Sequence, residues 1–369
     1  MPVFDGKLRA NDIFGALFNM IIGQYFTDDK YVTGYDLVNV HKVDGTLYGD
    51  TKINYSVDVL PTEEWNDYAE AANLLAVKKP DAPKQQAIRI SHTRMAWITV
   101  DHYLTKRAWE SEGVFGQFIS ETLAQIGNAK KNFESKLFNA FIGTDKSTKA
   151  TCNISLSLPT KGTESNNRLR AQTIAQTLAD LAVEMKDSTR DYNEYNFLRS
   201  YDLSSLEFVV NGKYANEITN IDLPTIFHKE GLSDITTKNI LPAKYFGTVI
   251  TKDGTTASNN TTVRSLLEMD YVVSGVTYHV LPGDLLPNSC AYKAVVTDSR
   301  GNKDNAVYTQ DDKVICKIID KNSVPFMDSF EVGTNFYNQR SLTENHYLIW
   351  GYSDLEHLQD YPFITISEA

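Results

Sequence analysis

Histidines and paired charges are the residues of this chain that could do acid–base chemistry or hold a metal. Sites of that kind usually place histidines and acids at a short, regular spacing, such as an H-E-x-x-H pair on one helix. The seven histidines form no such pattern: they are His41, His92, His102, His228, His279, His346 and His357. Asp101 and His102 are neighbours in a predicted strand, where adjacent side chains point to opposite faces. We therefore identify no catalytic residue and no metal ligand, and we expect no enzymatic activity.

The charged doublets have structural explanations. Glu63 and Glu64 fall in the first turn of a predicted helix, where the helix dipole favours acidic side chains. A solvated helix face explains Lys130 and Lys131 better than a phosphate contact does. The sequence contains neither a G-x-G-x-x-G or Walker-type phosphate loop nor a G-x-S-x-G turn, so we expect no cofactor.

Composition indicates a folded protein of ordinary surface chemistry. The chain has 369 residues, of which 42% are hydrophobic and 11% aromatic, enough for a substantial core. Its formal net charge of −11 argues against a protein that tracks DNA phosphates, because such proteins usually present a basic surface.

The cysteines and the amino terminus give no sign of secretion or of a membrane anchor. Cys152, Cys290 and Cys316 are far apart and include no C-x-x-C pair, so we expect reduced thiols made in a cytoplasm. The amino terminus lacks the pattern of a secretory signal. Residues 13–26 are apolar but interrupted, and are shorter than the ~20 residues that span a bilayer. We expect no membrane partner.

The elements that position these residues centre on one long amphipathic helix, predicted over 114–142. Apolar side chains recur there every three or four residues, which keeps one helix face apolar: Phe115, Ile119, Leu123, Ile126, Ala129, Phe133, Leu137 and Phe141. Gly143 is expected to end the helix in a left-handed conformation. A helix of about 40 Å is typical of a structural brace.

An extended hairpin precedes the helix. Residues 47–60 and 88–100 are predicted strands, with a short helix from Thr62 between them. A hairpin that stands off a body cannot bury its own apolar side chains, so Ile88, Ile90 and Trp97 indicate a partner surface.

The remainder of the chain alternates between helices and short strands. Helices are predicted over 169–186 and from 213 to 219, and a short one from 224 to 228. The predicted strands cover residues 206–210, 246–251, 276–281, 292–297, 313–319, 346–352 and 362–366. The predicted fold class is therefore α+β.

Three segments, in this order, resemble the major capsid protein of tailed bacteriophages, which has the Hong Kong 97 fold. ITVDHYLTKRAWESEGVFGQFISETLAQIGNAKKNFESKLFNAFI resembles the hairpin exit and spine helix of that family. DLSSLEFVVNGKYANEITNIDLPTIFHKEGL resembles its apolar strand ending in Asn before a helix, and LPAKYFGTVIT resembles a later short strand. The pattern is closest to the small podoviruses of Gram-positive hosts and, more distantly, to crAss-like phages.

The resemblance implies a division of the chain. Residues 1–45 would be the amino-terminal arm and 46–98 an extended β-hairpin loop. Residues 99–166, with the spine helix, would form a peripheral domain together with return strands from 326–369. Residues 167–325 would form the axial domain.

It also implies a function and partners. The chain would be a structural subunit of an icosahedral or prolate bacteriophage capsid, self-assembling into pentamers and hexamers that enclose double-stranded DNA. Its partners would be copies of itself, a separate scaffolding protein, a portal, and DNA in weak, non-specific contact. It would reside in the virion after assembly in the cytoplasm of the host bacterium.

Two alternatives stay open at this stage. The same fold could form an encapsulin-like bacterial compartment. A glycosidase-type enzyme with dispersed carboxylates would also leave no local motif.

Overall fold

The computed structural model describes residues 37–45, 51–62, 64, 77, 79–101, 112–219, 239–254, 261–298 and 301–369, with side chains except at 44, 101, 112–123, 216, 218 and 219. The helices are α2 (Val38–His41), α5 (Glu112–Thr144), α6 (Glu164–Glu184) and α7 (Gly212–Thr219), with short 3₁₀ turns η1 (Ala150–Cys152) and η2 (Ala243–Tyr245). The first eight strands in chain order are β1 (Lys42–Asp44), β2 (Thr51–Ser56), β3 (Lys84–Asp101), β4 (Asn153–Leu156), β5 (Leu206–Asn211), β6 (Asn239–Leu241), β7 (Gly247–Val249) and β8 (Val263–Ser265). The later strands are β9 (Met269–Val273), β10 (Val276–Val280), β11 (Val295–Thr297), β12 (Lys303–Asn305), β13 (Val307–Gln310), β14 (Val314–Asp320), β15 (Phe326–Asn338), β16 (Thr343–Ser353) and β17 (Phe363–Glu368).

Several predicted features lie outside the described residues. They are the helices expected over 13–26, from Thr62 and over 224–228, together with Glu63, His102 and His228. The side chain of Asp101 is also outside the description.

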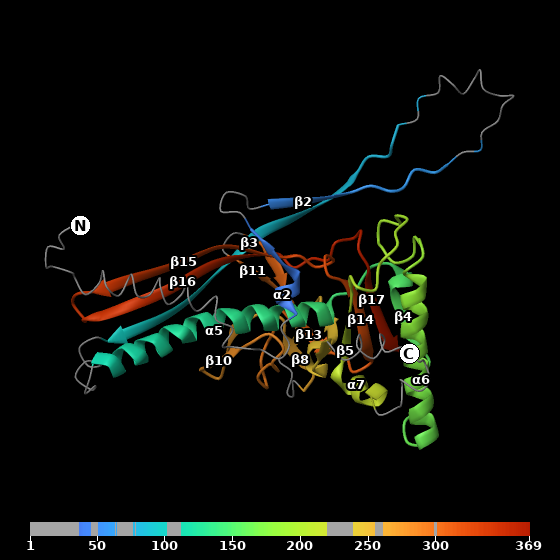
Figure 1. Ribbon diagram of the computed structural model, residues 1–369. Helices are drawn as coiled ribbons and strands as arrows, with labels where there is room; N and C mark the ends of the chain where they lie inside the picture. Colours follow the sequence, from blue (N-terminus) through green and yellow to red (C-terminus); the bar gives the residue numbers. More distant parts are fainter. Residues whose placement is uncertain are drawn as a thin grey trace.

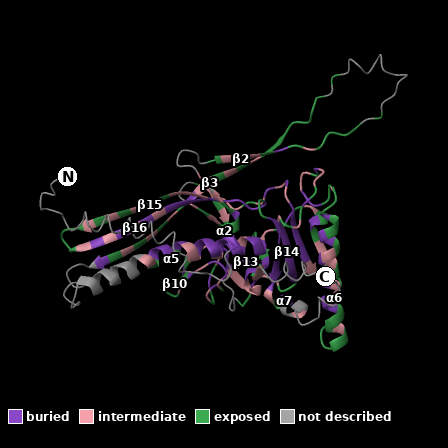
Figure 2. Cartoon of the chain, in the orientation of Figure 1, coloured by how far each residue is buried: buried purple, intermediate pink, exposed green. Residues whose placement is uncertain are grey.

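Helix α5 crosses the middle of the molecule, as Figure 1 shows, and is the predicted long helix extended by two residues at each end. Its 33 residues correspond to about 50 Å. The predicted apolar face is buried over its described part: Ile126, Phe133 and Leu137 are each no more than 5% exposed. Figure 2 shows this purple stretch beneath the sheet.

The prediction that Gly143 ends α5 in a left-handed conformation is wrong. The helix continues through Thr144, and Gly143 does not have the positive φ that such a stop requires. Close packing explains the glycine instead, because a Cβ there would lie 2.2 Å from the carbonyl oxygen of Tyr245. Position 143 therefore lets the η2 turn approach the helix backbone.

One five-stranded sheet, in the order β1-β15-β16-β3-β2, lies along α5 (Figure 1). Strands β1 and β15 are parallel, and the other neighbours are antiparallel. Strand β16 alternates between the two faces: Leu348 and Trp350 are buried, whereas Tyr347 and Ile349 are only partly covered. The inner face packs on α5, where the rings of Phe133 and Trp350 lie 6.3 Å apart. On the outer face, several described apolar residues are exposed, among them Met95, Trp97 and Phe336.

The predicted hairpin is present but does not extend as far as 98. Strands β2 and β3 pair from Thr51 with Arg89 to Ser56 with Lys84. From Ile90 onwards, β3 pairs with β16 of the same chain and belongs to the sheet. Only the described residues within 51–89, here called the ribbon, stand off the body (Figure 1). The prediction that the hairpin 46–98 packs away from its own body is therefore wrong for residues 90–98, which pair with β16.

A second five-stranded sheet has the order β4-β17-β14-β5-β6 and is covered on both faces. Helix α6 covers one face, with Ile174 and Leu178 in the same apolar cluster as Phe208 and Ile318. The carboxyl-terminal half of α5 covers the other face. Every residue of β5 and β14 is buried, as a central strand between two layers requires.

The strand pairing of this sheet crosses the expected domain boundaries. Strand β4 comes from 99–166 and β17 from 326–369, yet both join the sheet built on β14 and β5 from 167–325.

A smaller β region contains the sheet β7-β13-β8 with the hairpins β9–β10 and β11–β12. In Figure 1, β8, β10 and β13 lie beneath α5, whereas β11 lies above it, beside β3. Its apolar cluster includes Tyr271, Leu286 and Val307. The cysteines Cys152, Cys290 and Cys316 are free and buried. Among the described residues, no helix is both long and apolar enough to cross a bilayer.

Candidate assembly surfaces

Four histidines in the described part of the chain lie against carboxylates: His41, His92, His279 and His357. His41 Nε2 lies 3.1 Å from Glu207 in the core. His357 lies between two acids, with Nδ1 2.6 Å from Asp145 and Nε2 3.3 Å from Glu194. Burial opposes its charge, but the hydrogen bond to Asp145 prevails and raises the pKa of His357.

His279 and His92 each meet two acids as well. His279 places Nδ1 2.7 Å from Asp270 and Nε2 2.9 Å from Glu268, and these contacts raise its pKa. His92 places the same nitrogen, Nε2, 2.8 Å from Asp354 and 3.2 Å from Asp304. Burial opposes the charge on His92, but these two carboxylates raise its pKa to about 9.

Lys130 is buried, so the prediction of a solvated helix face is wrong for this residue. Its ammonium lies 2.9 Å from Glu331, 3.0 Å from Asp328 and 3.6 Å from Glu134. Lys42 adds a second cation, 2.7 Å from Glu134. Burial lowers the pKa of Lys130, but the three carboxylates raise it by more. This lysine joins α5 to β15 and is not available to bind a phosphate.

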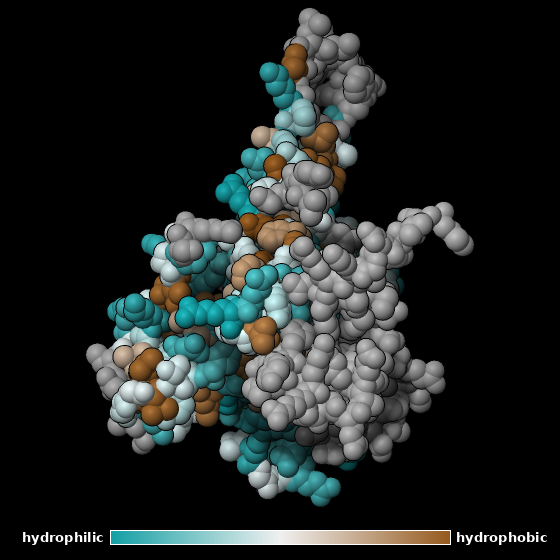
Figure 3. Space-filling model, turned by 90° about the vertical axis from the view of Figure 1, so that its left-hand side faces the viewer, coloured by the Kyte–Doolittle hydropathy of each residue, from teal (hydrophilic) through white to brown (hydrophobic). Residues whose placement is uncertain are grey.

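The ribbon carries the first exposed apolar surface, here called the ribbon patch. Its members are large side chains between 48% and 83% exposed: Ile53, Tyr55, Val57, Val59, Leu60 and Val77. Within β2 the exposure follows from the strand period, because Ile53 and Tyr55 alternate with the half-buried Lys52 and Asn54. Figure 3 shows brown, hydrophobic atoms along this projection. Grouped apolar exposure of this kind marks an interaction surface.

Polar contacts fix the base of the ribbon to its own body. The Asn54 amide donates to Asp360 Oδ1 over 3.0 Å, and the Leu198 amide donates to Asp58 Oδ1 over 2.9 Å. Arg190 also pairs with Asp58. The ribbon is therefore held at its base, while its apolar side chains face outwards.

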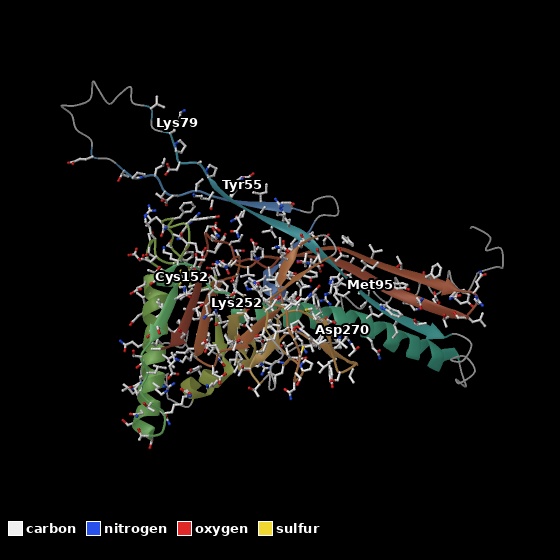
Figure 4. The ribbon with its side chains drawn as sticks, turned by 180° about the vertical axis from the view of Figure 1, so that it is seen from behind. Tyr55, Lys79, Met95, Cys152, Lys252 and Asp270 are labelled. Atoms are coloured by element: carbon white, nitrogen blue, oxygen red, sulfur yellow. The ribbon has the colours of Figure 1, made fainter. Side chains whose placement is uncertain are left out.

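The second exposed apolar surface is the outer face of the sheet on α5, here called the sheet patch. It comprises Met95, Trp97, Val332, Phe336 and Tyr347, from three adjacent strands. Trp97 and Tyr347 are register partners, and their rings stack 6.3 Å apart. Trp97 is still 59% exposed and Phe336 66%. Figure 4 shows that Met95 lies on the sheet and Tyr55 on the ribbon, well apart in one chain.

Sequence reasoning identified Trp97 as a partner surface but missed its setting. Trp97 belongs to a flat, three-stranded face and not to the projecting part of the hairpin. Phe336 and Val332 were missed because β15 was not predicted at all.

Comparison with known proteins agrees with this arrangement. A chain in the capsid structure of Staphylococcus phage Andhra matches with a TM-score of 0.59 at 12% identity, covering 93% of this chain and 88% of that one. A chain in the structure of the head fiber and inner core protein gp22 of native bacteriophage P68 matches with a TM-score of 0.59 at 12% identity, covering 88% and 83%. At such identities the likeness concerns the fold alone. A search of curated proteins finds no match.

The predicted Hong Kong 97-like capsid fold is thus confirmed, while neither the bacterial compartment nor the glycosidase finds support. The family model of the Phi29-like phage major capsid protein matches residues 5–352, nearly the whole length. The chain belongs to the family of Phi29-like phage major capsid proteins and is a structural subunit of a phage virion.

Proposed function

We propose that the subunit assembles by laying its ribbon patch against the sheet patch of a neighbouring copy. The observation that carries this proposal is the apolar exposure of the ribbon, whose members include Tyr55 at 63% and Val77 at 83%. Leaving such side chains in water costs about 25 cal/mol for each Å² that a partner would cover. A second copy supplies a complementary apolar face.

The direction of the ribbon supports contact between copies over contact within one chain. Figures 1 and 4 show the ribbon running away from the body, on the side opposite the free ends of β15 and β16. The polar anchors at Asn54 and Asp58 hold that direction. The ribbon of one chain therefore points away from its own sheet patch.

The division of the subunit into domains is part of the proposal, with one revision. We retain 1–45 as the arm and α5 with β15, β16 and β3 as the peripheral part. Strand β17 pairs with β14, and β4 pairs with β17, which favours counting these two strands with the axial part. The projecting loop is shortened to the ribbon.

The remaining partners follow from the capsid role. Pentamers and hexamers of this subunit would enclose double-stranded DNA, with a separate scaffolding protein and a portal, after assembly in the bacterial cytoplasm. The net charge of −11 supports weak, non-specific contact with DNA, since few counterions would be released. The capture of Lys130 by three carboxylates removes one basic candidate for tighter binding. No catalytic role is included.

Assembly of the purified chain tests the ribbon contact directly. Electron microscopy and sedimentation should show shells, sheets or rings for the wild type. Tyr55→Ser combined with Val57→Ser and Val59→Ser should leave mostly unassembled subunits with an unchanged melting temperature. Val272→Ser is the matched control, because Val272 is 69% exposed on the β9–β10 hairpin beneath α5 (Figure 1). Normal particles from the triple variant would refute the contact.

Deletion of residues 62–83 is a second test. It removes the distal ribbon but keeps the β2–β3 pairing, so the body should fold while assembly is impaired. Normal shells from the deleted chain would show that the distal ribbon is dispensable.

A further inference from the structure

A cavity of about 530 Å³ lies where the ribbon joins the body, and His92, Asp304 and Asp354 line it together. His92 is on β3, Asp304 is on the β11–β12 hairpin, and Asp354 directly follows β16. The side chain of His92 is only 10% exposed, and its ring stacks on Tyr352 with ring centroids 5.1 Å apart. The cavity thus has one rigid, buried nitrogen ligand in its wall.

The geometry around His92 differs from that of the other histidines held by acids. His279 and His357 use both ring nitrogens, one for each carboxylate, as an imidazolium with two N–H donors does. At His92 both carboxylates converge on Nε2, which carries at most one proton. One nitrogen and two carboxylate oxygens therefore lie within 4.8 Å of one another, close enough to contact the same ion.

We propose that His92 Nε2 and the carboxylates of Asp304 and Asp354 bind one divalent transition-metal ion, of the class of Zn²⁺ or Mn²⁺. A nitrogen with two carboxylate oxygens suits such ions. Binding displaces the Nε2 proton of His92 to water, and the two carboxylate charges then balance the charge of the ion. The carboxylate side chains are 33% and 42% exposed, so water from the cavity can complete the coordination.

A surrounding shell already orients these ligands. The Ser91 hydroxyl donates to Asp354 Oδ1, and the Asn302 amide holds the Ser91 carbonyl over 3.1 Å. Partners of this kind fix ligand orientation in metal sites. The bound ion would connect three segments that are distant in sequence and so fasten the base of the ribbon to the small β region.

Titration of the purified full-length chain tests the site. We expect Zn²⁺ or Mn²⁺ to bind with one ion per chain by calorimetry and to raise the melting temperature, because an ion that binds only the folded chain stabilises it. Asp304→Asn keeps the shape of the side chain and removes its charge, and we expect binding to weaken more than about 100-fold. His92→Gln should have the same effect.

His279→Gln is the matched control, since His279 also contacts two acids but on separate nitrogens. Its metal affinity should equal that of the wild type. Melting curves without metal establish that each variant is folded. Three outcomes would overturn the proposal: no saturable binding, binding that survives Asp304→Asn in a folded chain, or equal loss in His279→Gln. Assembly assays are separate, so failure of this site would leave the ribbon contact untouched.

Discussion

The sheet along α5 has one covered and one exposed face, whereas the sheet between α5 and α6 is covered on both. Burial along the strands reflects this contrast: β16 alternates between covered and partly covered residues, while β14 is buried at every position. The doubly covered sheet supplies stability to one subunit. The singly covered sheet retains exposed apolar side chains on its outer face, which we propose a second subunit covers.

A buried lysine also lies beneath or within each sheet, and the two lysines differ in the charge of their hydrogen-bond partners. Lys130, beneath the first sheet, is surrounded by three carboxylates, which raise its pKa. Lys317, in the second sheet, donates to the Asp145 carbonyl over 2.6 Å and to the Thr365 hydroxyl over 2.9 Å. Because burial dominates over these neutral partners, the pKa of Lys317 falls to about 7. Two similarly buried lysines therefore have pKa values shifted in opposite directions, because their partners differ in charge.

The largest expected effect compares two phenylalanines on opposite sides of the first sheet. Phe133 is 2% exposed and packs beneath it, so Phe133→Ala should cost about 3–5 kcal/mol of unfolding free energy. Phe336 is 66% exposed on the outer face, so Phe336→Ala should change the stability of the unassembled subunit by less than about 0.5 kcal/mol. Chemical denaturation of both variants checks this. Equal losses would mean that the outer face is covered within one chain.

The same contrast explains which parts could be predicted from sequence. Helix α5 and the buried strands β5 and β14 have clear apolar patterns, because their own chain covers them. Strand β15 was missed because FMDSFEVGTNFYN mixes Gly, Asn and Asp with apolar residues. Its pairing with β16, which is distant from any local pattern, is what makes it a strand. Phe336 is 66% exposed, and the proposed contact with a second copy would account for an apolar residue there.

The sequence also does not predict that His92 and Asp354 come together in space. His92 and Asp354 are separated by 262 positions, and only the fold brings them to one cavity. Spacing rules find ligands that share one helix or turn, and these ligands come from three segments. Lys130 was misassigned for a similar reason, since its carboxylate partners Asp328 and Glu331 belong to β15.

The second prediction concerns the ion cluster under the first sheet. Lys130→Met removes a buried cation that lies 3.6 Å from the buried Glu134, and breaking a buried ion pair costs about 3–5 kcal/mol. Lys42 still contacts Glu134, so we expect the lower end, about 3 kcal/mol. Lys131→Met, at the half-exposed neighbouring position, is the control and should have little effect. If Lys130→Met is also neutral by thermal and denaturant unfolding, the cluster does not stabilise the subunit.

A smaller loss is expected where α5 meets the η2 turn. Gly143→Ala places a Cβ 2.2 Å from the Tyr245 carbonyl oxygen, so the turn must move, at a cost of about 1–3 kcal/mol. Gly162→Ala is a useful contrast, because a Cβ there meets nothing within 4 Å although φ is +142°. Loss at 143 therefore reports on packing, and loss at 162 on backbone strain. A stabilising Gly143→Ala would show that the approach of the turn is looser than described.

The last prediction concerns the pH dependence set by Lys317 in the doubly covered sheet. Its pKa is about 7 in the folded chain and 10.5 as the ordinary value, so between these limits the unfolded chain binds a proton that the folded chain lacks. Stability from this group must therefore rise with pH across that window, by at most about 1.4 kcal/mol per pH unit, and stay constant below it. Lys317→Met abolishes the slope, and subtracting its unfolding free energies from those of the wild type at several pH values removes the contribution of every other group. A difference that does not change between about pH 7.5 and about pH 9 would mean that Lys317 stays charged when buried. The two sheets would then hold their lysines in the same protonation state, and the contrast between ionic and neutral partners would fail.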